Sequence, residues 1–237
     1  MINFRNRFAV YVPFSFVCLL PLLLSSCGTN NIFLKSSRKF SELSNIAHLE
    51  PFDNIRQIQN IASTRTIDSL AELSRRVMFS AINHNYSLLP ISRYIPIKSI
   101  NKYLNTREEV IEIIRKIENN KKSFGEIQIP KAILDIAGNN KYIMATYQQG
   151  CLRADALIIK NNLIDRITAV VYNPNPAELN THISKLVVMI FDIERNNLAF
   201  YSSSELQDVN QLNPEVLAEQ YATIIRQYRD VIERGRK

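Results

Sequence analysis

The sequence has little of what common cofactor and metal sites are built from. Its five glycines are dispersed along 237 residues, so it has no glycine-rich loop that would cradle a phosphate group. Its three histidines, His48, His84 and His182, have no metal-ligand spacing with one another or with a cysteine. We therefore expect no cofactor and no bound metal, and we expect each histidine to lie in a loop or at the surface.

Cysteine is also scarce, and the three cysteines lie in different parts of the chain. Cys18 lies inside an amino-terminal apolar run and Cys27 follows that run, so Cys151 has no disulfide partner in the folded part of the chain. A lone cysteine of this kind is more often a small buried residue than a nucleophile. We expect Cys151 to be buried, and we expect the stability of the domain to come from a packed core.

The sequence shows no arrangement of polar residues that is typical of a catalytic site. Ser202-Ser203-Ser204 has the character of a loop and not of a nucleophile elbow. Asp155 and Asp165 are a candidate carboxylate pair, although spacing alone does not establish one. We predict no catalytic residue. The glutamates expected to be solvated on the polar side of a helix are Glu108, Glu109 and Glu112.

Aromatic side chains are represented by phenylalanine and ten tyrosines, with no tryptophan. Two interpretations stay open for the tyrosines: they line a groove for sugar or peptide, or they are divided between core and surface. The candidates for lining a groove are Tyr94, Tyr103, Tyr147 and Tyr172.

The chain does carry a strong amino-terminal targeting pattern. Two arginines, Arg5 and Arg7, precede an apolar run from Phe8 to Leu24, and small residues follow the run. A basic head, an apolar middle and a small-residue exit are typical of a secretory signal peptide. The run is about 17 residues long and contains two prolines, so it is marginal for spanning a hydrocarbon core of ~30 Å.

Leu24-Ser25-Ser26-Cys27 resembles the lipobox of bacterial lipoproteins. The resemblance implies cleavage between Ser26 and Cys27, with residues 1–26 removed and Cys27 acylated as the new first residue. Simple secretion and an uncleaved apolar helix are the alternatives. Ordinary secretory cleavage prefers a small residue at the −3 position, which Leu24 occupies here.

The same resemblance predicts where the protein lies. Two or three acyl chains hold a protein stably in a bilayer, whereas a single chain holds it only marginally. Gly28 occupies the position where, in many two-membrane bacteria, an aspartate retains lipoproteins in the inner membrane. We therefore expect an outer-membrane anchor, with the domain facing the periplasm.

The remaining sequence predicts a tether and one domain. Gly28–Asn31 and Lys35–Lys39 are polar and lack periodicity, which indicates a flexible tether over residues 27–42. Residues 43–237 are expected to form a single α/β domain. The alternation of elements predicts an α/β (α+β) two-layer sandwich with a mixed sheet and about three to four helices.

Expected strands lie over 45–52, 141–148, 164–172, 184–193 and 198–201, with short edge strands within 86–97. Over 164–172 the apolar spacing also fits a helix, and that alternative stays open. Expected helices lie over 67–83, 106–118, 130–138 and 214–234, with Thr106 as the cap of the second and with apolar residues at three- and four-residue steps on the buried face of the long helices. The strand over 141–148 is expected inside the sheet, and a tight turn at Arg195-Asn196-Asn197 is expected to join the last two strands into a hairpin.

Part of this domain resembles a group of periplasmic lipoproteins. Lys131–Ala137 followed by Lys141–Met144 resembles a helix-then-strand step in proteins similar to the TolB amino-terminal domain and to the lipoprotein subunit of the curli secretion channel. The Pro51-Phe52 pair and the Asp192 to Tyr201 region also resemble this group and uncharacterised envelope lipoproteins. The resemblance implies scaffolding or protein binding in the envelope, and it carries no catalytic residues.

The leading hypothesis is a lipid-anchored envelope protein with a non-catalytic domain that binds or scaffolds another envelope protein. The alternative is an envelope hydrolase or a lipoprotein that binds glycan or peptide, and a ring or channel subunit is a third possibility. The net charge of +7 comes from scattered basic residues, and we expect no nucleic-acid partner in this compartment. The sequence leaves the oligomeric state open.

Overall fold

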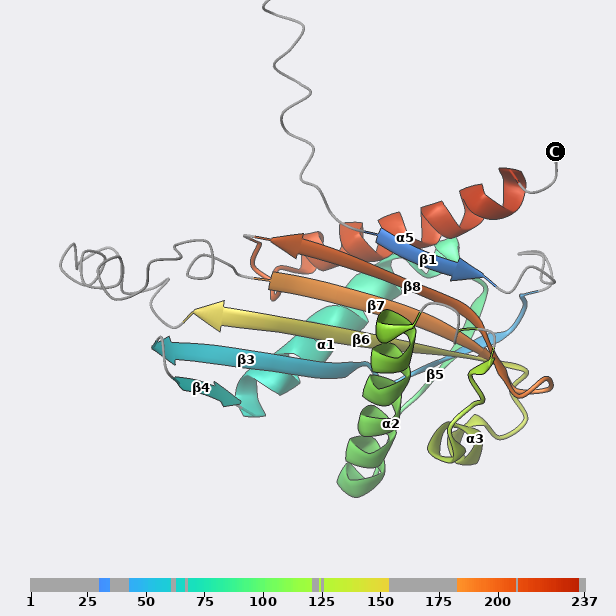
Figure 1. Ribbon diagram of the computed structural model, residues 1–237, viewed down its shortest axis with the longest axis horizontal. Coiled ribbons are helices and arrows are strands. Elements are labelled where there is room, and N and C mark those ends of the chain that lie inside the picture. The colour runs from blue at the N-terminus through green and yellow to red at the C-terminus, as the bar shows by residue number, and fades with distance from the viewer. Residues whose placement is uncertain are drawn as a thin grey trace, which may run out of the picture.

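The computed structural model describes residues 30–34, 43–60, 63–66, 68–120, 124, 126–153, 183–207 and 209–234, and these build one mixed sheet with helices on both faces (Figure 1). The sheet has eight strands in the order β1-β8-β7-β6-β2-β5, with β3 beside β6 and β4 beside β3. The strands are β1 (Asn30–Leu34), β2 (Ile46–Leu49), β3 (Phe52–Asn60), β4 (Ser63–Thr66), β5 (Ile91–Ile95), β6 (Tyr142–Arg153), β7 (Ile183–Asp192) and β8 (Asn197–Gln207).

Strand β6 is the centre of this sheet. On one side it pairs antiparallel with β7, and β7 and β8 form a hairpin whose turn contains Asn196 at a positive φ of 47°. Asparagine tolerates this left-handed conformation, as the predicted Arg195-Asn196-Asn197 turn requires. On its other side β6 pairs in parallel first with β2 and then with β3. The predicted inner strand and the predicted hairpin are therefore confirmed.

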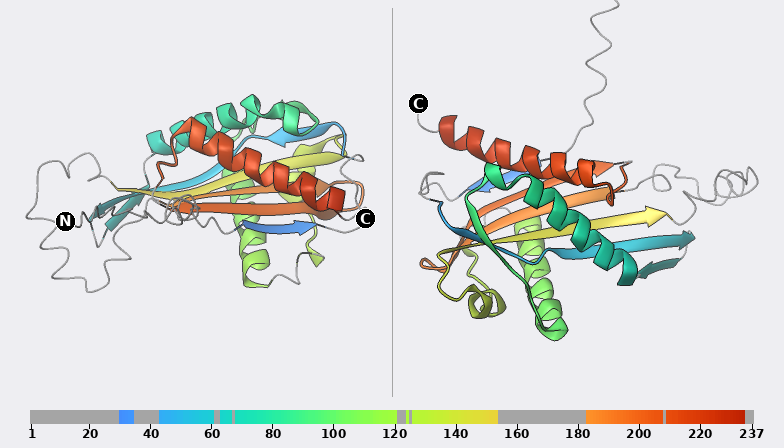
Figure 2. Two further views of the ribbon diagram at one scale, coloured as in Figure 1. Left: turned by 90° about the horizontal axis from the view of Figure 1, so that it is seen from above. Right: turned by 180° about the vertical axis from the view of Figure 1, so that it is seen from behind.

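The helices cover the sheet from two sides, as Figure 2 shows. They are α1 (Asp68–His84), α2 (Ile100–Asn119), α3 (Lys131–Ala137) and α5 (Pro214–Arg234), with a short helix η4 (Tyr86–Leu88). One hydrophobic core joins α2 and α3 to Ile143 and Ala145 of β6, and a second joins α1 and α5 to Tyr142 and Met144.

The predicted α/β class with a mixed sheet and three to four helices is confirmed. The sheet lies between two layers of helices, whereas we expected a two-layer sandwich. Strands β6 and β7 are apolar on both faces, so helices are needed to cover each face. Within the described residues, none of the helices is both long and apolar enough to cross a bilayer.

The helix predictions hold for position and for the buried face. Helix α5 has the predicted bounds, and α1 lies one residue further along the chain than expected. Helix α2 buries its predicted stripe but begins earlier, at Ile100, where Ser99 accepts a hydrogen bond from the backbone of Lys102. The predicted cap at Thr106 is wrong, because the Thr106 hydroxyl lies inside the helix and donates to the carbonyl of Lys102 over 2.7 Å.

Three further segments correct the predictions. Asn30–Leu34 lies within the expected tether but forms β1, antiparallel to β8. The β3–β4 hairpin replaces a stretch for which we predicted no strand beyond Phe52. Ser202–Ser204 is not a loop, because it lies inside β8, where its three residues pair in turn with Val188, Val187 and Leu186 of β7. The predicted strand over 164–172 lies outside the described residues.

Candidate functional site

At the edge of the sheet opposite β1, one short stretch of strand has no neighbouring strand on its outer side. Strands β2 and β3 follow one another alongside β6, separated by Glu50 and Pro51. Strand β5 pairs with β2, and β4 pairs with β3 only from Arg56 onward. Among the strands that the structure describes, none pairs with the outer side of Phe52–Ile55. Such an edge exposes backbone groups that must be satisfied or covered.

Side chains from both helical layers cover this open edge. Tyr103 of α2 places its hydroxyl 3.2 Å from the carbonyl oxygen of Pro51 and 3.0 Å from Oδ1 of Asp53. Arg75 of α1 places Nη1 3.4 Å from the same Asp53 oxygen, and its guanidinium carbon lies 5.1 Å from the centre of the Tyr103 ring. The three side chains stand where a paired strand would otherwise lie, so this edge does not accept an added β-strand.

Burial dominates the electrostatics of this cluster. Asp53 is only 2% exposed, and burial raises its pKa against the opposing effects of the Tyr103 hydrogen bond and the charges of Arg75 and Arg107. Burial also raises the pKa of Tyr103, and the nearby Asp53 charge adds to this shift. Tyr103 therefore remains a neutral hydrogen-bond donor at neutral pH.

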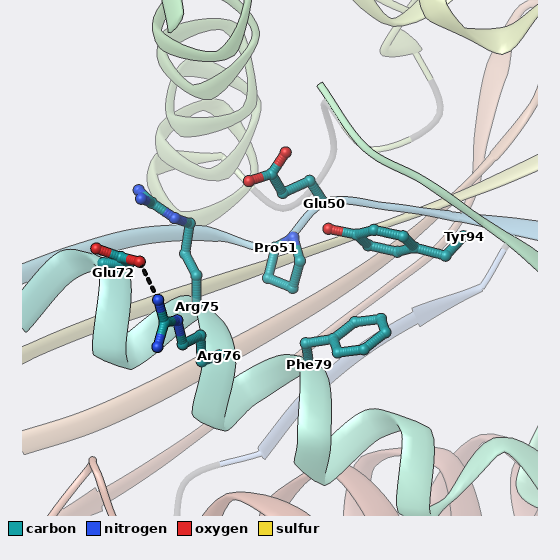
Figure 3. Close-up of a pocket in the computed structure, with 7 residues that line it drawn as sticks. All are labelled: Glu50, Pro51, Glu72, Arg75, Arg76, Phe79 and Tyr94. Carbon is teal, nitrogen blue, oxygen red and sulfur yellow. Dashed lines mark hydrogen bonds and ion pairs between the residues drawn. The ribbon is translucent and has the colours of Figure 1, made fainter. Parts of the chain in front are cut away.

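A cleft of about 300 Å³ lies beside the cluster (Figure 3). Its apolar wall is formed by Phe79 of α1 and Tyr94 of β5, whose ring centres are 4.7 Å apart. Burial raises the pKa of Tyr94 to about 12, so its hydroxyl is neutral at physiological pH. The other residues that line the cleft are Glu50, Pro51, Glu72, Arg75 and Arg76.

The two carboxylates of the cleft are each engaged by the protein itself. Glu50 Oε2 accepts a hydrogen bond from the backbone nitrogen of Ile97 over 2.8 Å, and Glu72 forms an ion pair with Arg76 one turn along α1. In Figure 3 the Glu72 carboxylate lies at one end of the cleft, beside Arg76 and away from Glu50 and Tyr94. The arrangement suits recognition of polar and aromatic groups better than acid–base catalysis.

The predicted tyrosines do not form a common groove. Tyr94 lines the cleft, Tyr103 is buried behind it in the edge cluster, and Tyr147 is buried in the core shared with α2. Tyr172 lies outside the described residues. The pattern missed Asp53 and Arg75, although the Pro51-Phe52-Asp53 sequence at a strand break marks the place where the sheet edge opens.

The remaining candidates have mixed outcomes. Glu108 and Glu112 are exposed as expected, whereas Glu109 is half-buried and accepts a hydrogen bond from the backbone of Ala132. His84 is exposed, but the surface prediction for His48 is wrong, because His48 lies in β2 with no exposed area.

Several candidates fall outside the described residues: they are His182, Asp155, Asp165 and the side chain of Cys151. The burial of Cys151, like the acylation of Cys27, stays a prediction. Within the ranges that the structure describes, no three His, Cys, Asp or Glu side chains are grouped closely enough to hold a metal ion.

A double-mutant cycle on Asp53 and Arg75 measures what the edge cluster contributes. We expect Asp53→Ala and Arg75→Ala to be coupled by about 1–2 kcal/mol in the free energy of unfolding, because the carboxylate is buried and Arg75 is mostly covered. Urea unfolding of the chain from Gly28 onward gives the four values.

The matched control is the Glu72–Arg76 pair, one residue away on α1. Both of these side chains are more than half exposed, so their coupling should stay below about 0.5 kcal/mol. Equal coupling in the two cycles would show that burial of Asp53 adds nothing to its interaction with Arg75.

Comparisons with known proteins give distant likenesses only. No family model and no curated protein matches the chain. Solved structures that resemble it include the PelC dodecamer from Paraburkholderia phytofirmans, with 6% identity, a TM-score of 0.37 and coverage of 84% of this chain and 94% of that chain. Another is the LpoB C-terminal domain from Salmonella enterica, with 8% identity, a TM-score of 0.27 and coverage of 70% and 84%. At these values the likeness establishes neither a shared family nor a shared function.

Proposed function

We propose that this protein is a lipid-anchored component of a bacterial cell envelope whose α/β domain binds another envelope protein through the cleft at the open sheet edge. The lipobox-like Leu24-Ser25-Ser26-Cys27 supports the anchor and its outer-membrane location. The single observation that carries the binding role is the cleft itself, where an aromatic wall and a charged rim meet at an interrupted strand.

The composition of the cleft matches a protein partner. Arginine and tyrosine are enriched among the residues that dominate binding energy at protein interfaces. Here Arg76 stands on the rim with 75% of its side chain exposed, while Phe79 and Tyr94 form the apolar wall. A volume of about 300 Å³ is at the lower end for small-molecule pockets and suits one or two side chains of a partner. We expect the partner to insert an aromatic or aliphatic side chain beside a polar group that reaches Arg75 or Arg76.

The hydrolase alternative has less support from this site. A general acid and a general base need carboxyl groups that are free to exchange protons with substrate. Glu50 holds the backbone at Ile97, and Glu72 is paired with Arg76. We therefore assign the cleft a binding role without a catalytic step.

Photo-cross-linking from the rim of the cleft tests the binding role. A benzoylphenylalanine in place of Arg76 is expected to give a covalent adduct with one envelope protein in intact cells. The matched control replaces Arg115 of α2, which has a similar exposure of 67% but does not line the cleft. Mass spectrometry of the adducts identifies the partner.

The outcome that would contradict the proposal is equal labelling from the two positions, or recovery of the monomer alone from both. Adding Tyr94→Ala separates a specific adduct from an accidental one, because it removes half of the apolar wall. The adduct at position 76 should then decrease several-fold, and an unchanged adduct would assign the contact to another surface.

A further inference from the structure

The position of β1 limits how the domain sits relative to its membrane. Only Gly28 and Thr29 separate Cys27 from Asn30, the first residue of β1. An extended chain covers at most about 3.6 Å per residue, so Asn30 lies no more than about 11 Å from an acylated Cys27. The linkage is too short for the flexible tether that the sequence predicts to lie between the anchor and the first strand.

The headgroup layer takes up part of this length. A bilayer is about 40–45 Å thick with its headgroups and about 30 Å without them, which leaves about 5–7 Å of headgroup on each side. The acyl chains place Cys27 at the inner boundary of that layer. Asn30 therefore lies within roughly 4–6 Å of the outer headgroup surface, by the same chain geometry.

A helix does not fit into the remaining space. An α-helix with its side chains is about 10–12 Å wide. On one face α5 lies over the neighbour of β1, because Gln220 of α5 donates to the carbonyl of Ser204, the residue of β8 that pairs with Asn30. On the other face α2 reaches β8, because Tyr201 donates to Glu118 over 3.0 Å. Both faces near β1 thus carry a helical layer that would hold Asn30 too far from the lipid.

The outer edge of β1 is the side that the short linkage can bring to the membrane. Figure 1 shows β1 at one margin of the sheet, with the carboxyl-terminal half of α5 running alongside and beyond it, and the strand order places β5 at the other margin. The cleft lies at the margin opposite β1, four to five strand spacings away, which is roughly 20–24 Å.

We propose that the protein stands edge-on on its anchoring membrane, with β1 and the adjoining half of α5 against the lipid headgroups and the cleft directed away from them. This inference rests on the proposed acylation of Cys27. It deepens the proposed function by naming the class of partner: a soluble or wall-associated protein that reaches the cleft from the side away from the anchoring membrane, and not a protein embedded in the same leaflet.

Energy transfer from two labelled positions to the membrane surface tests the orientation. The full-length acylated protein is reconstituted into vesicles of phosphatidylethanolamine and phosphatidylglycerol that carry an acceptor dye on the headgroup. A donor dye is attached through an unnatural amino acid at Gln207, exposed in β8 near the anchored edge, or at Arg76, exposed on the rim of the cleft. Transfer from position 207 should be several-fold higher, because the cleft lies three to four strand spacings, roughly 14–19 Å, further across the sheet than β8.

A longer linkage provides the control. An insertion of about 12 Gly/Ser residues after Gly28 adds a root-mean-square span of about 20 Å, so the domain is free to tumble and the difference between the two positions should shrink. Equal transfer from both positions in the acylated protein without the insertion would overturn the orientation and leave the anchor intact. A preparation with no acyl mass on Cys27 and no vesicle binding would overturn the anchor and the orientation together.

Discussion

Replacing Cys27 with serine is expected to move the protein from the membrane fraction to the soluble fraction of the cell envelope. The thiol is the group that the lipobox resemblance marks for acylation, and a serine hydroxyl does not replace it. Each buried methylene contributes about 0.8 kcal/mol to membrane binding, so loss of two or three acyl chains removes the anchor completely. Fractionation and the intact mass of the purified protein measure the change.

Cys18→Ser is the matched control for this prediction. Cys18 lies inside the apolar run and lacks the small residues that precede Cys27, so this variant should remain acylated and membrane-bound. A Cys27→Ser protein that stays in the membrane would contradict the lipid anchor. If its mass still included residues 1–26, the uncleaved apolar helix would be the anchor in its place.

The sequence was enough to predict an element when the apolar residues of that element alone showed a helix or strand period. Helix α5 buries Leu217, Tyr221, Ile224 and Ile225 at the predicted three- and four-residue steps. The apolar residues of β7 and the turn at Asn196 likewise defined the hairpin. Burial of such a face stabilises the element whatever the rest of the fold, and so local sequence predicts it.

The open edge was not predictable, because it depends on contacts between distant segments. Asp53 and Arg75 are 22 residues apart, and Asp53 and Tyr103 are 50 apart. They meet only because β2 and β3 share β6 as a neighbour while β5 and β4 leave a gap between them. Strand β1 was missed for a similar reason, since its five residues gain their partner from β8, at the other end of the chain.

His48 was predicted to lie at the surface on the general tendency of histidine, although its neighbours indicated otherwise. Ile46, Ala47 and Leu49 are all buried, and a continuous apolar run is typical of a strand covered on both faces. The imidazole Nε2 lies 3.3 Å from the Thr146 hydroxyl, and in the described part of the chain Nδ1 has no hydrogen-bond partner. Burial therefore lowers the pKa of His48 to about 3.

This buried imidazole should make the domain sensitive to acid. The unfolded chain binds the proton with a pKa of about 6.5, and the folded chain binds it only near 3, so the unfolded state takes up more protons in between. The contribution of His48 to stability is complete above pH 6.5 and falls by about 1.4 kcal/mol per pH unit below it. Between pH 6.5 and 4.5 the loss from this single group amounts to about 2 kcal/mol, and the loss continues until the pH nears the folded pKa.

The variant His48→Gln isolates this effect, because glutamine can keep the hydrogen bond to Thr146 and does not titrate. It loses the ring contacts with Tyr86 and Tyr94, so we expect it to be less stable than the wild type at pH 7.5 but to lose about 3 kcal/mol less on acidification to pH 4.5. Urea unfolding at the two pH values gives the difference, and His84→Gln removes an exposed imidazole as the control. Parallel pH profiles for the wild type and His48→Gln would mean that the buried ring is protonated in the folded state. The His48 ring lies 6.0 Å from the ring of Tyr94 in the cleft wall. A positive charge on His48 would therefore change the electrostatic environment of the cleft and the groups that it binds.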